Sequence, residues 1–184
     1  MKVKGSALRS TLNYLREHFT ADQVRRILER IPAEHRVSAE KPVLISSWYE
    51  ADLLYALMHA MAAEVTVDPR EFYRTLGRQS CDDGLNTVYK IFFKVGTPSF
   101  MLKFTIQVWS NYYSEGKMVL VEGGTHSAHL RLEGIRTADE AMCYRVTGWL
   151  ERALELSGGH GIHMAHETCV RSGGAACEWK AIWQ

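Results

Sequence analysis

The last segment of the chain carries the feature that most constrains the fold, a pair of cysteines placed around a glycine turn. Cys169 and Cys177 flank Ser172-Gly173-Gly174. A three-residue loop with glycine in the left-handed conformation is a common hairpin type. In that register the two cysteines lie directly across from each other, with Cβ atoms about 5 Å apart. The pairing depends on the loop, because a two-residue loop would shift the register.

Two facing thiols supply half of a structural zinc site, which takes four protein ligands. Cys143 is the natural third ligand, because it lies near the start of a predicted helix, where the helix dipole favours a thiolate. The fourth ligand is His166 or Glu167. Alternation along a strand places Glu167 on the same face as Cys169 and His166 on the opposite face, unless a bulge intervenes. The alternative is three buried cysteines and a surface histidine with no metal.

The length of the whole chain, residues 1–184, predicts one globular domain. Its 46% hydrophobic and 23% charged residues are ordinary for such a domain, and a net charge of +1 gives no electrostatic footprint for nucleic acid. The longest uncharged apolar run, residues 53–63, is too short to span a membrane, and the first ten residues lack the apolar core of a signal peptide. We therefore expect a cytoplasmic protein, in which cysteines are free or metal-bound more often than disulfide-linked.

Hydrophobic periodicity divides the chain into a helical part and a part rich in strands. It predicts helices over residues 5–17, 20–31, 47–61, 69–80, 86–95 and 97–113, with residues 33–46 irregular and a break at 81–84. From Gly116 the period changes to two, which predicts two strands with a hairpin at Gly123-Gly124. A long helix opened by residues 137–140 follows, and then two strands over 161–170 and 175–183. Helices followed by ββαββ indicate an α+β domain with an antiparallel sheet.

Aromatic side chains concentrate in the two helices predicted over residues 86–113. Core packing explains such a concentration, and so does a pocket for a small molecule. Each residue taken alone fits the core better. As a set, the candidate pocket residues are Phe92, Phe93, Phe100, Phe104, Trp109 and Tyr112, with His126 or His129 as additions.

The spacing of the cysteines and His166 resembles that of the 4-vinyl-reductase-type domain. This fold is shared by the aromatic-sensing domains of phenol- and xylene-responsive transcriptional activators. Related folds occur in haem-based nitric-oxide sensors and in TRAPP vesicle-tethering subunits. In the aromatic sensors a Cys, a Glu and two further Cys hold zinc. The resemblance therefore implies a zinc ion held by Cys143, His166, Cys169 and Cys177, with His166 in place of that glutamate and against the strand-parity argument.

Over residues 5–183 the chain is also similar to a family of stand-alone myxobacterial proteins. This second resemblance implies a helical layer on a four- or five-stranded antiparallel sheet, with a ligand pocket between helices and sheet. It rests on Ser47-Trp48-Tyr49, Val88-Tyr89-x-x-Phe92-Phe93, Trp109-x-x-Tyr112-Tyr113, Gly148-Trp149-Leu150 and Cys177-x-Trp179.

Three functions fit these features. The first is a non-enzymatic sensory domain that binds a hydrophobic or aromatic small molecule, holds a structural zinc ion, forms a homodimer and signals through a partner protein. The second is a dimeric protein–protein adaptor of TRAPP-like fold, its interior filled by side chains or a captured acyl chain. The third is an enzyme with catalytic zinc, which needs an open coordination position and an acid–base pair that the sequence does not display. Haem sensing is a variant of the first, disfavoured because the Tyr-x-Ser-x-Arg signature for haem propionates is absent.

Overall fold

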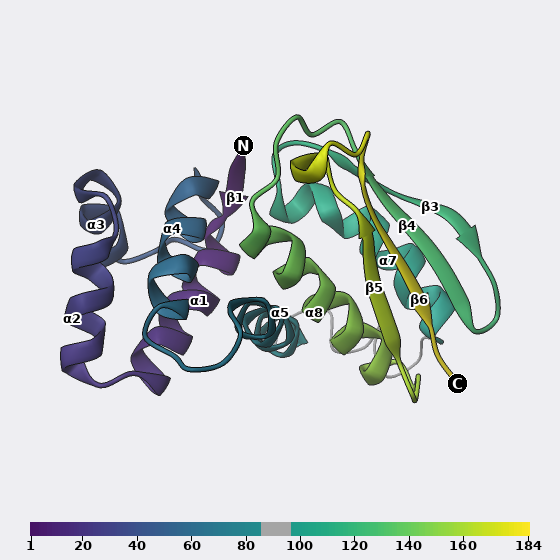
Figure 1. The fold of residues 1–184 in the computed structure, drawn as a ribbon, viewed down its shortest axis with the longest axis horizontal. Helices are drawn as coiled ribbons and strands as arrows, with labels where there is room; N and C mark the ends of the chain where they lie inside the picture. Colours follow the sequence, from purple (N-terminus) through teal and green to yellow (C-terminus); the bar gives the residue numbers. More distant parts are fainter. Residues whose placement is uncertain (86–96) are drawn as a thin grey trace.

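The structure is a computed structural model that describes residues 1–85 and 97–184. Its elements form a helical half and a half built on a sheet (Figure 1). The helical half contains β1 (Lys2–Lys4), α1 (Gly5–His18), α2 (Ala21–Arg30), α3 (Ala33–Glu40), β2 (Trp48–Glu50), α4 (Ala51–Ala62) and α5 (Pro69–Leu85). The second half contains α7 (Pro98–Tyr112), β3 (Lys117–Gly123), β4 (Ser127–Glu133), α8 (Glu140–Leu156), β5 (His163–Thr168), the 3-10 turn η1 (Val170–Ser172) and β6 (Cys177–Ile182). The predicted α+β class is confirmed.

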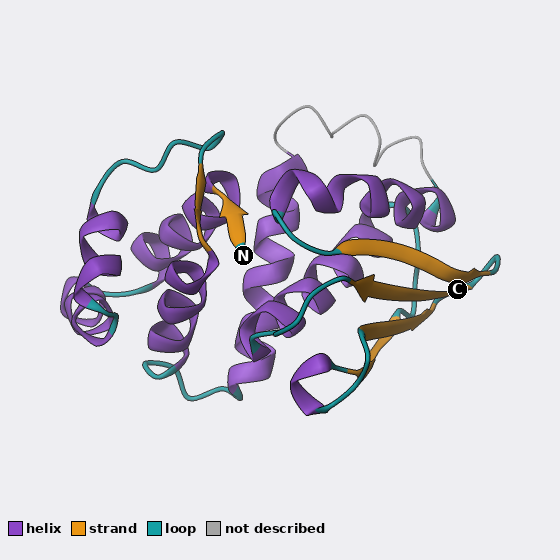
Figure 2. Ribbon diagram, turned by 90° about the horizontal axis from the view of Figure 1, so that it is seen from above, coloured by secondary structure: helices purple, strands orange, loops and turns teal. Residues whose placement is uncertain are grey.

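The sheet of the second half has the strand order β3-β4-β6-β5, and every neighbouring pair is antiparallel. The helices α7 and α8 lie on one face of this sheet (Figure 2). Leu130 and Leu132 of β4 are buried toward them. The alternate residues His129 and Arg131 bind Glu178 of β6 at 2.8 and 2.7 Å. The sheet thus buries one face and carries charged side chains on the other, as antiparallel sheets commonly do.

A glycine on each of two helices lets the two halves meet closely. A Cβ atom on Gly77 of α5 would lie 2.0 Å from the backbone oxygen of Arg145 on α8. A Cβ atom on Gly148 of α8 would lie 2.0 Å from the backbone oxygen of Arg74 on α5. Because any side chain there would collide with backbone, the α5–α8 crossing depends on both glycines. This crossing is the most extensive helix contact between described residues.

Local signals predicted several helix starts correctly. Thr20 and Gln23 form a capping box at the start of the helix predicted over 20–31, with the Thr20 N–H donating to Gln23 Oε1 at 2.9 Å. Asp68 accepts from the Arg70 N–H at 2.7 Å, and Thr97 accepts from the Phe100 N–H at 3.3 Å. Short polar side chains just before a helix satisfy N–H groups that the helix leaves unpaired, so these starts are readable from sequence.

Three local predictions were wrong. Residues 33–40 form α3 rather than an irregular segment, since Arg36 donates to the backbone oxygens of Leu28 and Glu29 and ties this short helix to α2. Residues 48–50 form β2 rather than the start of α4, because they pair with the N-terminal strand β1. The chain does not break at 81–84, since α5 continues through Gly84. The cap of α8 is Asp139, within the predicted opening at 137–140, because Asp139 accepts from the Ala141 N–H at 2.8 Å.

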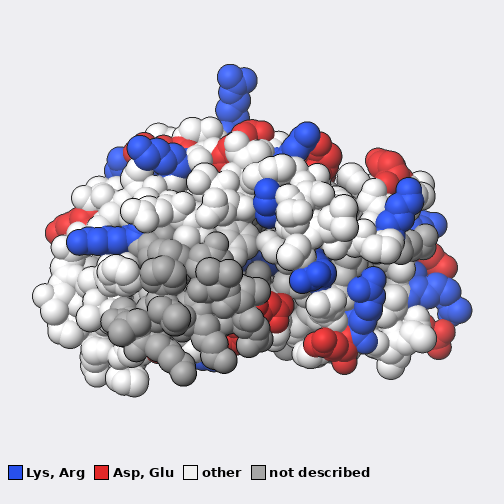
Figure 3. Space-filling view, turned by 180° about the vertical axis from the view of Figure 1, so that it is seen from behind, with Lys and Arg blue, Asp and Glu red and all other residues white. Residues whose placement is uncertain are grey.

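The surface and the helices bear on two further predictions. Lys and Arg are interspersed with Asp and Glu over the described part of the face shown in Figure 3, so that face presents no continuous basic surface. Among the described residues, no helix combines the length and apolar character needed to cross a membrane. The helix predicted over residues 86–95 falls outside the described residues, and Phe92 and Phe93 with it.

Candidate metal centre and internal cavity

The four predicted metal ligands come together at one end of the second half. One candidate ligand atom from each of Cys143, His166, Cys169 and Cys177 lies within 4.8 Å of all the others. The Sγ atom of Cys169 lies 3.7 Å from that of Cys143 and 3.5 Å from that of Cys177. All the cysteines in the chain are free thiols, so no disulfide competes for this cluster. We call these four residues the Cys3His cluster.

The Cys3His cluster draws on three separate elements. Cys143 lies in the first turn-and-a-half of α8, His166 on β5, and Cys177 at the first position of β6. Cys169 lies between β5 and the turn η1. The cluster therefore ties the last helix of the fold to its last two strands.

A bulge in β5 decides how His166 and Glu167 are oriented. The β5–β6 register places His166 opposite Trp179 and then Thr168 opposite Glu178, so one extra residue of β5 intervenes. The extra residue shifts strand alternation by one. His166 joins the thiols and stacks on Trp179, with ring centroids 4.7 Å apart. Glu167 instead makes an ion pair with Lys180 at 2.7 Å. The structure therefore brings to the thiols His166, the residue that the family resemblance implies, and not Glu167, which strand parity favoured.

The connection between the two last strands differs from the predicted three-residue loop. β5 ends at Thr168, and Cys169 lies outside the ladder instead of pairing with Cys177 across it. The turn η1 follows, and the Gly174 N–H donates to the backbone oxygen of Cys169 at 2.9 Å. This longer connection curls back and still brings the two sulfur atoms together. The contact of the thiols was predicted, and the register that was to produce it was wrong.

A buried hydrogen-bond chain holds the strand of Cys177 against the helix of Cys143. Trp179 of β6 donates from Nε1 to the hydroxyl of Thr147 at 2.9 Å. That hydroxyl in turn donates to the backbone oxygen of Cys143 at 2.9 Å. Both side chains are buried. These hydrogen bonds thus fix β6 against α8 beside the Cys3His cluster.

Electrostatics within the cluster separate the three thiols. The contact with Cys177, together with burial, raises the pKa of Cys143. The same contact lowers the pKa of Cys177, because a hydrogen bond from Cys143 favours its thiolate. Burial raises the pKa of Cys169. Three thiols packed this closely resist ionisation of more than one unless a cation joins them.

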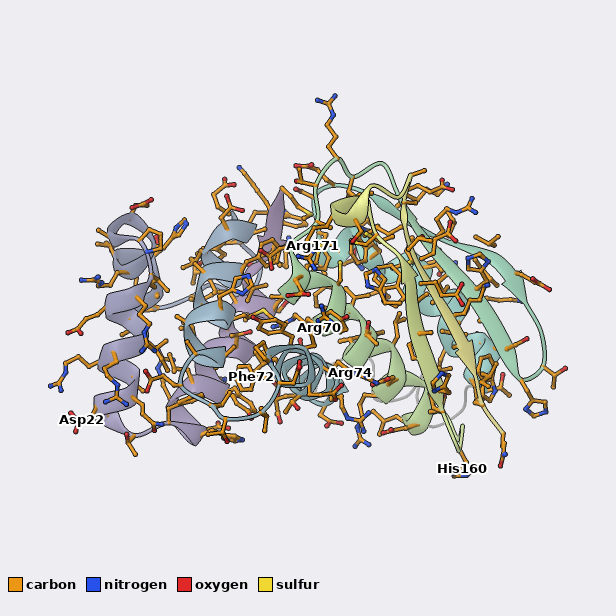
Figure 4. The ribbon with its side chains drawn as sticks, viewed as in Figure 1. Asp22, Arg70, Phe72, Arg74, His160 and Arg171 are labelled. Atoms are coloured by element: carbon orange, nitrogen blue, oxygen red, sulfur yellow. The ribbon has the colours of Figure 1, made fainter. Side chains whose placement is uncertain are left out.

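A polar groove of about 320 Å3 runs beside the cluster and reaches Cys143, His166 and Cys169. Glu140 and Glu167 line this groove, and the Glu140 carboxylate accepts from Arg70 at 3.1 Å and from Arg171 at 2.8 Å. Figure 4 shows these two arginines, which reach the start of α8 from α5 and from η1. Two guanidinium partners hold Glu140 as an ion-paired carboxylate rather than a free general base.

A second feature is a partly open cavity of about 60 Å3 between the two halves. Trp109 and Tyr112 line it, as do Ser80, Arg145 and Trp149 from α5 and α8. The lining is mostly apolar. Two predicted pocket residues thus belong to the cavity.

The other predicted pocket residues lie elsewhere. The side chain of Phe100 is 47% exposed and lies outside the lining. His126 is exposed, and His129 pairs with Glu178 on the outer face of the sheet. The side chain of Phe104 falls outside the described atoms.

Arg145 is a residue of the cavity that the sequence reasoning missed. Its side chain is only 4% exposed, although it stands on a helix whose other arginine, Arg152, is partly exposed. The only sequence signal was its position three residues after the buried Met142, on the inner side of α8. Periodicity treats a charge at such a position as a boundary of the apolar stripe, so the signal was weak.

The fold is similar to that of solved H-NOX (haem NO-binding) proteins. The Fe(II) unliganded H-NOX protein from K. algicida matches with a TM-score of 0.76 at 13% identity, over 98% of this chain and 96% of that one. The H-NOX protein from S. oneidensis in the Fe(II)NO ligation state matches with 0.75 at 13% identity, over 98% and 99%. At such identities the likeness shows the fold alone. No protein-family model matches the sequence, and no curated protein does. The more specific resemblances therefore stay predictions.

The described cavity does not fit a haem. Its volume of about 60 Å3 is well below the 300 Å3 or more of an ordinary small-molecule site, and a porphyrin needs more than that. No histidine or cysteine is among the described lining residues, and residues 86–96 contain neither. The direct α5–α8 backbone contact at Gly77 and Gly148 further limits how far the two halves separate.

Proposed function

We propose that this protein is a non-enzymatic sensory domain whose cavity between the two halves takes a small apolar ligand and whose Cys3His cluster holds a structural zinc ion. The observation that carries the proposal is that the cavity bridges the two halves of the fold. Ala7 and Ser80 line it from the helical half, and Met118 and Trp149 line it from the sheet half. A ligand there contacts both halves at once.

Zinc is supported by the spacing of the sulfur atoms. A tetrahedral ion with bonds of about 2.3 Å to sulfur holds its sulfurs about 3.8 Å apart. The two measured sulfur–sulfur distances are 3.5 and 3.7 Å. The Nε2 atom of His166 is buried with no hydrogen-bond partner, and a metal ion is one group that satisfies such an atom. Cys and His ligands favour zinc over calcium or magnesium, which prefer oxygen.

The number of ligands supports a structural role rather than catalysis. Four protein ligands fill a tetrahedral shell and leave no position for water or substrate. The nearby Glu140 is engaged by two arginines. The same four ligands join α8 to β5 and β6, so the ion would hold the sheet half in one arrangement while the cavity responds to its ligand.

Signalling would follow from the position of the cavity beside the α5–α8 crossing. A ligand shifts a conformational equilibrium only by the difference in its affinity for the two states. Because both halves line the cavity, the affinity for a ligand depends on the relative position of the two halves at the α5–α8 crossing. We infer that occupancy is read by a partner protein through the relative position of the halves. The homodimer stays a prediction from the sequence.

The test measures metal and ligand separately on the full chain. Metal analysis of protein purified without added zinc is expected to find about one equivalent of zinc per chain, and none would contradict the metal centre. Native mass spectrometry and thermal shift with small apolar compounds are expected to detect binding in the cavity. Val146→Phe, which fills the cavity, should abolish that binding, while Val121→Phe on the exposed strand β3 serves as the matched control.

The small volume of the cavity favours a second candidate, a protein–protein adaptor with a filled interior. An adaptor of this kind would show no thermal shift with any small molecule. Val146→Phe would then lower stability without changing any binding property. These outcomes separate the adaptor from the sensor in the same experiment.

A further inference from the structure

The guanidinium of Arg145 is buried without a negatively charged partner. It donates to Thr11 Oγ1 at 2.6 Å, to the backbone oxygen of Ala7 at 3.2 Å and to Ser80 Oγ at 2.9 Å. These acceptors, from α1 and α5, are all neutral. Among the described residues, no carboxylate lies within 4.0 Å of this guanidinium, and residues 86–96 contain no Asp or Glu.

Asp83 is an acidic group that acts on Arg145 from farther away. Its two carboxylate oxygens accept from Ser10 Oγ at 2.5 Å and from Gln79 Nε2 at 2.9 Å. It therefore already has its own partners and balances the charge of Arg145 only in part. A buried cation without a close counter-ion is unfavourable, which is why buried charges are almost always paired.

The pKa of Arg145 also reflects the lack of negative charge around its guanidinium. Burial lowers the pKa of its guanidinium, and the surrounding tyrosines, Tyr113 and Tyr55 first, raise it only partly. Buried charged groups in proteins are normally paired, so an anion at Arg145 would supply the partner that its neutral acceptors do not.

Arg145 also lines the cavity, which is otherwise mostly apolar. Val108, Trp109 and Val146 supply apolar wall, and Ser80 and Arg145 supply the polar end. A site with one polar end and an apolar remainder suits a ligand with the same division.

We propose that the cavity binds a small monocarboxylic acid, whose carboxylate pairs with Arg145 and whose short apolar chain contacts Val108, Trp109 and Val146. This rests on the proposed function in that the cavity must take a ligand at all. A carboxylate accepts charge-assisted hydrogen bonds from a guanidinium, and these are stronger than hydrogen bonds to neutral acceptors. One cation balances one carboxylate charge, whereas a phosphate monoester carries nearly two charges at neutral pH. The small volume limits the chain to a few carbon atoms.

A purely structural role for Arg145 makes a different prediction. In that case Arg145 only links α8 to α1 and α5 through its neutral acceptors. The cavity would then treat an acid and its amide alike, because the two have nearly the same shape.

The first experiment needs no mutation. Calorimetry and thermal shift on the full chain compare acetate, propionate and butyrate with their amides at pH 7. The acids are expected to bind and to raise Tm as concentration rises, with at least one acid binding about 30-fold or more tightly than its amide. Equal affinity of acids and amides would overturn the carboxylate inference and leave the sensor proposal intact. Binding of neither class would also overturn the carboxylate inference, whereas the sensor proposal fails only if the small apolar compounds bind no better.

The second experiment assigns the discrimination to Arg145. Arg145→Met keeps the length of the side chain and removes its charge, and it should weaken binding of the preferred acid about 30-fold or more while sparing the amide. Arg152→Met on the same helix is the matched control, since Arg152 pairs with Asp82 and Glu155 outside the cavity. Unchanged preference for the acid in Arg145→Met would contradict the assignment. If that variant does not fold, the wild-type comparison of acid with amide decides.

Discussion

The Cys3His cluster and the cavity both bury groups that can carry charge, and they do so in opposite ways. In the cluster, three thiols and a histidine face one another within 4.8 Å, and one cation would satisfy them all. In the cavity, a cation faces neutral acceptors and apolar wall, and one anion would satisfy it. The first arrangement suits a permanent ion and the second an exchangeable ligand. The comparison suggests how one fold combines a fixed support with a responsive site.

The largest effect is expected at the cluster. Cys177→Ser removes a buried ligand and should lose zinc, and the free energy of unfolding should fall by about 3 kcal/mol or more, because structural zinc contributes directly to folding. For a chain of this size, that corresponds to a Tm decrease of about 6–12 °C. Calorimetry and metal analysis measure the two losses.

Cys81→Ser is the matched control, because Cys81 is an equally buried thiol outside the cluster. It should keep its zinc even where packing changes cost some stability. Equal loss of Tm in both variants, with metal content unchanged, would mean that the thiols of the cluster are ordinary core residues.

The next effect distinguishes the two candidates for the fourth ligand. His166→Gln should weaken zinc binding by more than about 100-fold, since even partners that only orient ligands contribute about 10- to 100-fold. Glu167→Gln should leave affinity unchanged, because Glu167 pairs with Lys180 on the surface. Competition with a chromophoric chelator measures both affinities. A reversed ranking would show that the bulge in β5 does not determine the ligand.

The Cys3His cluster could be predicted from the sequence and the role of Arg145 could not, for a physical reason. Cys169 and Cys177 lie close in sequence, and the residue types that bind zinc are few, so spacing carried much of the information. The bulge at Glu167 shifts the alternation of side chains along β5, and no local sequence pattern indicates this bulge. The partners of Arg145 lie in α1 and α5, more than sixty residues away. The strand β2 was missed similarly, because its partner is the N-terminal strand β1.

A smaller effect tests the link between the two regions. Gly148→Ala places a Cβ atom against the backbone oxygen of Arg74 and should cost about 1–3 kcal/mol, the usual range for overpacking. It should also weaken ligand binding, while zinc stays bound because the cluster lies on the far side of α8 from this contact. Gly84→Ala is the control: among the described residues its Cβ would meet the Tyr112 hydroxyl at 3.8 Å, an ordinary contact, and alanine favours the helix by up to about 1 kcal/mol. Urea unfolding measures both changes.

The smallest effect is a pH dependence at the start of α8. His59 Nε2 lies 2.9 Å from Asp139 Oδ1, and this hydrogen bond raises the pKa of His59 against the effect of burial. The pKa of Asp139 is lowered, since hydrogen bonds from His59 and from the Ala141 N–H outweigh its burial. A raised histidine value means that the stabilisation is complete below the unfolded pKa of about 6.5 and is lost as pH rises through the folded value. The contribution of Asp139 to stability is lost only in acid, as the pH falls through its lowered pKa.

Both side chains are partly exposed, so the loss between pH 6 and pH 8.5 should be about 0.5 kcal/mol. His59→Gln should remove this dependence, while His160→Gln, at the far end of the sheet half (Figure 4), should keep it. Urea unfolding at the two pH values measures the difference between variant and wild type, in which any titration of the zinc ligands cancels. An identical pH slope in wild type and His59→Gln would show that the contact does not stabilise the start of α8. The Cys3His cluster would then be stabilised by contacts within the sheet half alone. The cavity, in contrast, is lined by residues of both halves.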